Sequence, residues 1–185
     1  MKKIKSENFD KYTKFLILVA VFVISGIFGF IYETIFYKID LGYFVKRGST
    51  VGPWIPIYAY GGLFVTLLTR KYKKNPLLVF VISTVICGIL EFSMGYILLN
   101  VFHTRAWNYN IEIWNFGNIG GFICLRSVLF FGASSLFLMY GIIPFVKSMA
   151  LKFNKITFSY ITLIPGVLFL IDIIYSNIHF LINFF

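Results

Sequence analysis

Acidic residues are the scarcest charged class in this 185-residue sequence, with seven carboxylate side chains against 17 lysines and arginines. Charged residues of both signs make up only 13%, about half the share usual for a soluble domain. Apolar residues make up 59%, and 23 residues are Phe. A soluble domain of this length cannot bury so much apolar surface in one core. Composition therefore predicts a single domain, residues 1–185, whose surroundings are largely lipid.

Cysteine and the familiar catalytic motifs are also scarce. The two cysteines, Cys87 and Cys124, lie far apart in apolar runs, which excludes a disulfide framework and a thiolate metal site. No His-Glu-x-x-His, Gly-x-Ser-x-Gly or Cys-x-x-Cys motif occurs, and there is no Gly-x-x-x-x-Gly-Lys-Ser/Thr nucleotide-binding loop. We therefore expect neither a catalytic site nor a cofactor. An ATPase that drives this protein would be a separate chain.

Five apolar runs account for most of the sequence, and a spanning helix needs about 20 mostly apolar residues. The second run is short and rich in Gly and Pro ("GSTVGPWIPIYAYGG"), so it is either a span or a shallow, re-entrant segment. The fifth contains Pro165-Gly166, where it can tilt or break. The pattern predicts an all-α, polytopic integral membrane bundle with about five transmembrane helices. The runs are Phe15–Tyr37, Trp54–Thr69, Pro76–Phe102, Ile119–Val146 and Ile156–Phe185.

Basic residues cluster between the apolar runs, which is typical of a topology signal in a multi-pass protein of the cytoplasmic membrane. With five spans, twelve basic residues lie on the side of the N-terminus, five of them in the N-terminal segment (Lys2, Lys3, Lys5, Lys11 and Lys14). Four lie on the other side. This bias predicts a cytoplasmic N-terminus and an external C-terminus. Because the charges form no solvated, aromatic-lined face, we expect no nucleic-acid partner; the main partner is the lipid bilayer.

Four charged side chains lie inside the predicted spans: Glu33, Glu91, Arg126 and Asp172. Each costs roughly 2.5–3.5 kcal/mol at the centre of a helix in the membrane, so each should face a partner or a wet cavity. We expect Arg126 to pair with Glu33 or Glu91. Three interpretations stay open: an ion pair that only fixes helix packing, a polar cavity in the outer half of the membrane that binds a small polar or anionic solute, and a proton relay.

The loop from His103 to Gly121, "HTRAWNYNIEIWNFGNIGG", is predicted to be external. Its aromatic residues favour an interfacial loop anchored at the membrane surface. A sharper hypothesis is a lid over the cavity, with Arg105 and Asn108 pointing inward and glycines providing flexibility. Elsewhere, Gly26 and Gly29, like Gly88 and Gly95, are spaced to let helices approach closely.

Several stretches resemble, in order, a known membrane family: "FGFIYET" (Phe28–Thr34), "KRGSTVGPWIPIYAYGG" (Lys46–Gly62), "ILEFSMGYILLNVFHTRAWNYN" (Ile89–Asn110) and "NIGGFICLRSVLFFG" (Asn118–Gly132). The chain is similar to the CmpB-type family of type IV ABC-transporter membrane proteins, up to about Gly141. This resemblance implies a polytopic, permease-like component of a bacterial membrane whose Glu, Arg and Trp/Tyr positions form a shared site. In the first block, the residues that agree are Arg47, Gly48, Gly52, Pro53, Pro56, Ile57, Tyr58 and Gly61.

The chain departs from the family pattern at its charged positions. Leu99 stands where a second Glu is usual, Asn108 replaces an Asp, and Phe122 replaces the Arg of a Gly-Arg-Ile-Cys-Leu motif. Arg126 lies four residues after Phe122, about one helical turn, so it could stand in for the missing Arg on the same helix face. Two lost acids also mean that the ligand chemistry of the family can differ here.

The resulting interpretation is a transport-associated, permease-like or solute-binding subunit, with a separate ATPase or other membrane subunits as candidate partners. A broken half-helix near Pro53 could aim backbone N–H groups at an anionic solute. The alternative is a non-transporting scaffold or assembly protein whose buried charges only fix helix packing, and a membrane enzyme is the weakest option. The candidate substrate-binding residues are Glu33, Glu91, Arg126, Arg105, Trp107, Asn108 and Tyr109.

Overall fold

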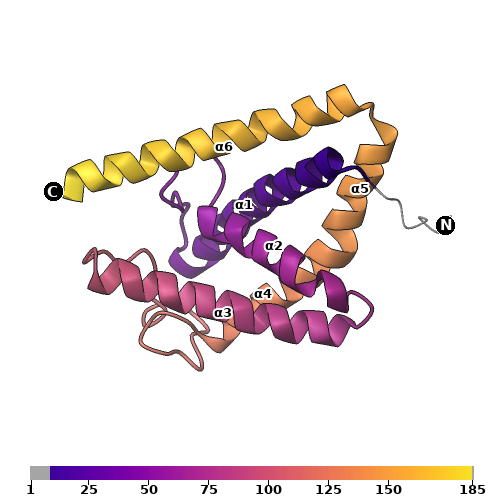
Figure 1. The fold of residues 1–185 in the computed structure, drawn as a ribbon. Helices are drawn as coiled ribbons and strands as arrows, with labels where there is room; N and C mark the ends of the chain where they lie inside the picture. Colours follow the sequence, from indigo (N-terminus) through magenta and orange to yellow (C-terminus); the bar gives the residue numbers. More distant parts are fainter. Residues whose placement is uncertain (1–8, 185) are drawn as a thin grey trace.

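Helices make up the regular structure of the protein (Figure 1). The computed structural model describes residues 9–184, so the predicted topology residues Lys2, Lys3 and Lys5 lie outside the described part. The all-α prediction is confirmed. The helices are α1 (Lys11–Leu41), α2 (Pro56–Thr69), α3 (Pro76–Asn100), α4 (Leu125–Phe137), α5 (Ile143–Lys152) and α6 (Lys155–Phe184).

Four helical stretches among the described residues are long and apolar enough to cross a bilayer: Lys11–Leu41, Pro76–Asn100, Leu125–Lys152 and Lys155–Ile182. Helix α2 is the exception, because its 14 residues extend only about 21 Å at 1.5 Å per residue. That is shorter than the roughly 30 Å hydrocarbon core of a membrane. The second apolar run is thus a helix but not a full span, as its Gly/Pro content allowed.

Helix α2 begins beside the middle of α1. After α1 the chain turns back through residues 42–55, and the Ile55 N–H donates a hydrogen bond to the Gly26 carbonyl oxygen at 3.0 Å. Ile55 is extended because the next residue is Pro56, which occupies the first helical position with its fixed φ. Segment 42–55 therefore runs back along α1 to about its middle, and the short helix α2 continues from there to the end of the bundle at which α3 begins.

The bundle has two chemically different ends. Where α1, α3 and α6 begin, Lys155 pairs with Asp10 at 2.6 Å, and Tyr12 donates to Ser159 at 3.0 Å. We call this the basic end, because most described lysines lie near it. At the opposite end, α1 and α3 finish, α4 begins, and the loop of residues 101–124 folds back over the helices (Figure 1). We call this the pocket end.

Two prolines inside the apolar helices are absorbed without breaking them. Between α4 and α5, residues Leu138–Ile142 form one π-helical turn, in which the Ile143 N–H reaches the Leu138 carbonyl five residues back. Pro144 follows; a wider turn is one way to relieve the clash of a proline ring with the preceding carbonyl. Helix α6 continues through Pro165, so it does not break there.

Helix α1 is the central helix: half of its most apolar stretch is buried, against 17–28% for the other three spans. Glycines bring its neighbours close, as the sequence predicted. A Cβ on Gly26 would lie 2.5 Å from the Phe169 ring of α6, and one on Gly29 would lie 2.5 Å from Tyr58 Cδ2 of α2. On α3, Gly88 faces Val128 and Gly95 faces Trp107 and Phe122.

We predict that Gly29→Ala lowers the thermal stability of the detergent-solubilised protein by about 1–3 kcal/mol, the usual cost of overpacking. The added methyl group overlaps the half-buried Tyr58 side chain, including its Cβ and Cγ atoms, so the side chain or the helix must shift. Gly61→Ala on α2 is the matched control, because a Cβ there has nothing within 4 Å. An equal melting temperature for the two variants would contradict the close α1–α2 approach.

Candidate functional site

A polar pocket lies at the pocket end, between α1, α3 and α4, beneath the loop of residues 101–124. Five charged side chains line it, together with Tyr, Trp and Ser groups that add hydrogen-bonding capacity. Its cavity volume is about 40 Å³, enough for a few water molecules at about 10–15 Å³ each. The charged lining residues are Glu33, Arg47, Glu91, Glu112 and Arg126.

Arg126 pairs with Glu112, at 2.8 Å between Nη2 and Oε2. The predicted pairing with Glu33 or Glu91 is wrong, because Glu112 comes from the overlying loop rather than from a helix. The guanidinium carbon lies 4.0 Å from the centre of the Phe36 ring, and Nη1 reaches the Tyr32 hydroxyl at 3.5 Å. Arg126 Nε has no hydrogen-bond partner among the described residues. The Arg126 guanidinium therefore joins the loop of residues 101–124 to α4 and α1, and its Nε–H group is left without an acceptor among the described residues.

Glu33 has its own arginine, Arg47, at 3.0 Å between Oε2 and Nε. The Arg47 guanidinium stacks on Tyr37 of α1, with 3.8 Å between Cζ and the ring centre, and its Nη2 donates to the Ala106 carbonyl at 3.4 Å. Tyr37 in turn donates to Glu112. Arg47 thus ties segment 42–55 to α1 and to the loop above it.

Glu91 of α3 is bound only by uncharged donors. It is 5% exposed, and it accepts hydrogen bonds from the Tyr109 hydroxyl and from Ser127 Oγ, the latter at 2.9 Å. Burial and the nearby Glu91 raise the pKa of the Tyr109 phenol well above its ordinary value, which keeps Tyr109 a donor. Among the described side chains, no Lys or Arg forms an ion pair with Glu91.

The loop covers the pocket, but with different residues from those predicted to point inward. Arg105 is exposed and donates to Asn108 Oδ1 at 2.6 Å, so this pair lies outside the pocket lining. Trp107, Tyr109 and Glu112 line the pocket instead. Three loop glycines form turns with positive φ, which side-chain-bearing residues rarely adopt (Gly117, Gly120 and Gly121).

Backbone N–H groups near Pro53 already have an anionic partner within the chain. Val51 N and Gly52 N donate to the Asp172 carboxylate at 2.9 and 2.7 Å, and the Trp54 indole donates to it at 2.7 Å. The prediction that the broken half-helix aims such groups at an anionic solute is therefore wrong for these donors. The Asp172 carboxylate on α6 holds segment 42–55 against the bundle.

The hypothesis that Arg126 replaces a missing arginine at position 122 on the same helix face is also wrong. Helix α4 begins at Leu125, so Phe122 belongs to the loop and shares no helix face with Arg126. Phe122 instead packs against Phe92 of α3, and the Arg105 guanidinium lies over its ring at 5.4 Å.

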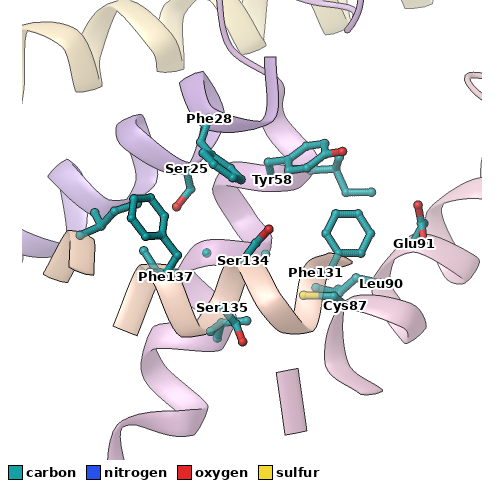
Figure 2. A pocket seen from close by; sticks show the side chains of 16 residues that line it. Ser25, Phe28, Tyr58, Cys87, Leu90, Glu91, Phe131, Ser134, Ser135 and Phe137 are labelled. Carbon is teal, nitrogen blue, oxygen red and sulfur yellow. The ribbon is translucent and has the colours of Figure 1, made fainter. Parts of the chain in front are cut away.

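A second cavity of about 70 Å³ adjoins the polar pocket on the side toward the basic end. Tyr58, Glu91 and Phe131 line both cavities, and Figure 2 shows them along one side of the second. The rest of its lining is mainly apolar, with the hydroxyls of Ser25, Ser134 and Ser135. Glu91 therefore lies at the junction between a charged cavity and an apolar one.

The structure brings together five of the seven predicted site residues, Glu33, Glu91, Arg126, Trp107 and Tyr109. Arg105 and Asn108 lie apart from the lining. Sequence reasoning missed Arg47, Tyr58 and Glu112 as site residues. Arg47 and Tyr58 had a signal, since both match the first family block, and Glu112 is one of only seven acidic residues.

A family model described as "Putative ABC-transporter type IV" matches residues 20–177, which include every residue of the pocket. The chain belongs to this family. No curated protein and no solved structure matches the chain. Together with four apolar helices of spanning length, the family membership makes this an integral membrane protein of a transporter-type family.

We predict that Glu112→Gln destabilises the protein by about 3 kcal/mol, because it leaves the Arg126 charge buried without its carboxylate partner. The two side chains are 4% and 13% exposed. Lys155→Gln is the control, since it removes an ion pair whose partners are 57% and 50% exposed and should change the melting temperature little. Similar losses in both variants would contradict a buried, structurally important pair.

We predict that Asp172→Asn loosens segment 42–55. An amide nitrogen cannot accept a hydrogen bond, so at least one of three buried donors loses its partner, at a cost of about 1–3 kcal/mol. Trypsin should then cleave after Lys46 or Arg47 several times faster than in the native protein. Ser176→Ala, which removes only a 3.2 Å hydrogen bond to the same carboxylate, should leave the cleavage rate nearly unchanged.

Proposed function

We propose that this protein is a permease-like or solute-binding subunit of a transport system, and that it binds a small polar solute in the pocket beneath the loop of residues 101–124. The observation that carries this proposal is the gathering of five charged side chains around one cavity inside a lipid-embedded bundle. Charged residues within membrane spans are rare and usually belong to substrate or ion pathways.

The presence of a cavity favours a solute-binding site over ion pairs that only fix helix packing. Two ion pairs that only fixed helix packing would need no space between them, and buried pairs are more stable when their remaining donors are satisfied. Here Arg126 Nε has no hydrogen-bond partner among the described residues, and the charged cavity shares part of its lining with a second cavity. Both features favour a site that accepts a ligand.

In our proposal the protein lies in the cytoplasmic membrane with its basic end on the cytoplasmic side, following the positive-inside rule. The pocket then faces the outer half of the membrane. The chain contains no nucleotide-binding loop, so energy for active transport would come from a separate ATPase or another membrane subunit.

The competing function is a non-transporting scaffold. One observation favours it: Glu33 and Glu112 are both neutralised by arginines of the same chain, which join loops to helices. A scaffold needs those contacts and no ligand. The two functions therefore differ in whether any small solute stabilises the folded protein.

We predict that a thermal-shift screen of polar solutes on the detergent-purified protein finds at least one that raises the melting temperature. A ligand at 100 times its Kd adds about 2.7 kcal/mol to the stability of the folded state. The shift should disappear in a folded variant that changes a charged pocket residue, Arg126→Gln or Glu91→Gln, and persist in Arg105→Gln. Arg105 is the control because Arg126 and Glu91 line the pocket and Arg105 does not.

The scaffold function would be favoured if no solute gives a shift that depends on Arg126 or on Glu91. In that case the double variant Glu112→Arg with Arg126→Glu should restore the stability lost in either single variant, since a brace needs only the pair and not its orientation.

A further inference from the structure

Glu91 differs from the other two pocket carboxylates because no cationic partner contacts it among the described residues. Glu33 and Glu112 each contact an arginine at 3.0 Å or less, whereas Glu91 contacts only the hydroxyls of Tyr109 and Ser127. It is 5% exposed and lies on a helix of spanning length. A buried carboxylate without a counter-charge is costly in its ionised form, so it either binds a proton or binds a cation.

All the hydrogen bonds around Ser127 can form at once if Glu91 carries a proton. Ser127 Oγ lies 2.9 Å from Glu91 Oε2 and 2.9 Å from the Cys124 carbonyl, while the Cys124 N–H donates to it. One hydroxyl carries one hydrogen and cannot donate to both oxygens. If Glu91 Oε2 carries a proton and donates it to Ser127, the serine donates to Cys124 and each group is satisfied.

The surroundings of Glu91 suit an organic cation. Tyr58 and Phe131 line both cavities, as Glu91 does, and Figure 2 shows these three residues at the second cavity. Trp107 lines the polar pocket. Aromatic faces attract ammonium groups and exclude water from them. The apolar second cavity, with about 70 Å³, is the larger of the two and can take a hydrocarbon substituent.

The charge of the pocket disfavours an anion. The lining contains one more carboxylate than guanidinium, and each guanidinium is already paired with a carboxylate and stacked on an aromatic ring. An anionic solute would have to displace one of those carboxylates, whereas a cation meets an unpaired one. The sequence left open a small polar or anionic solute, and the charge of the pocket favours a cation over an anion.

From these contacts we propose that Glu91 binds a small organic ammonium ion and releases its own proton in exchange. The O–H bond of the Glu91 carboxylic acid breaks, the proton leaves to solvent, and the carboxylate accepts hydrogen bonds from the ammonium N–H groups. The charge of the site is the same before and after the exchange. This proposal rests on the function proposed above and specifies its substrate class.

Other titratable groups face Glu91 from each neighbouring element and contribute to the pH dependence. Two further carboxylates oppose ionisation of Glu91, and the two guanidinium groups of the lining favour it. The groups are Glu33 on α1, Arg47 on segment 42–55, Tyr58 on α2, Cys87 on α3, Arg126 on α4, and Tyr109 and Glu112 on the loop.

The test compares probes of one shape and three charges: benzylammonium, benzoate and benzyl alcohol, with propylammonium, propionate and propanol as a smaller set. Calorimetric titration of the detergent-purified protein in two buffers of different ionisation enthalpy measures both affinity and proton release. We expect an ammonium probe to bind, with release of a proton and with affinity that falls as the pH is lowered. The matched anion and alcohol should bind far more weakly.

Glu91→Gln should weaken ammonium binding by at least about 30-fold, the loss expected when one member of a buried charge pair is neutralised. Glu91→Asp, which keeps the charge, should retain measurable binding, and Arg105→Gln should match the native protein. If Glu91→Gln does not fold, proton release by the native protein still decides the question.

Binding of the anion in preference to the ammonium, or ammonium binding without proton release and unchanged in Glu91→Gln, would overturn this inference while leaving the proposed function intact. Binding of none of the six probes would also overturn it, and the broader solute screen would then decide the proposed function separately.

Discussion

The structure depends on one constraint: a carboxylate that is shielded from water needs hydrogen-bond donors or a cation from the protein itself. Each buried or half-buried acid in the described chain binds groups from a distant segment, because an unpaired charge in an apolar environment is too costly to keep. Glu33 holds segment 42–55 through Arg47, Asp172 holds the same segment through its backbone, and Asp40 accepts from the Ile113 N–H at 2.9 Å. With so few acids, each one positions a loop.

These contacts explain how irregular backbone can lie at membrane depth. Such backbone is tolerated only where protein or enclosed water satisfies its polar groups. Segment 42–55 meets that condition from both sides, through Asp172 on α6 and through the Gly26 carbonyl on α1. Because α2 can then start halfway along α1, the second crossing leaves room beside Tyr58 for the two cavities.

The sequence predicted the helices well, since a run of about 20 apolar residues in lipid has few alternatives to a helix. It also indicated that the second run was irregular. The partners of the charges were not predictable in the same way. Arg126 was expected to pair with a helix acid of similar depth, but its partner, Glu112, reaches it because the loop folds back over the bundle. The conformation of this loop depends on side-chain contacts and on turns with positive φ, which the spacing of apolar residues in the sequence does not predict.

The contrast between paired and unpaired acids bears on whether a buried charge is a brace or a site. Glu112 and Glu33 are neutralised within the chain, so their contacts can be complete without a ligand. Glu91 is held in place by Tyr109 and Ser127, but its charge is not balanced by either. It lies where the linings of two cavities meet, so a cation in either cavity can contact it. The loop that holds the bundle together through Glu112 thus also holds, through Tyr109, the pocket carboxylate that has no ion-pair partner among the described residues.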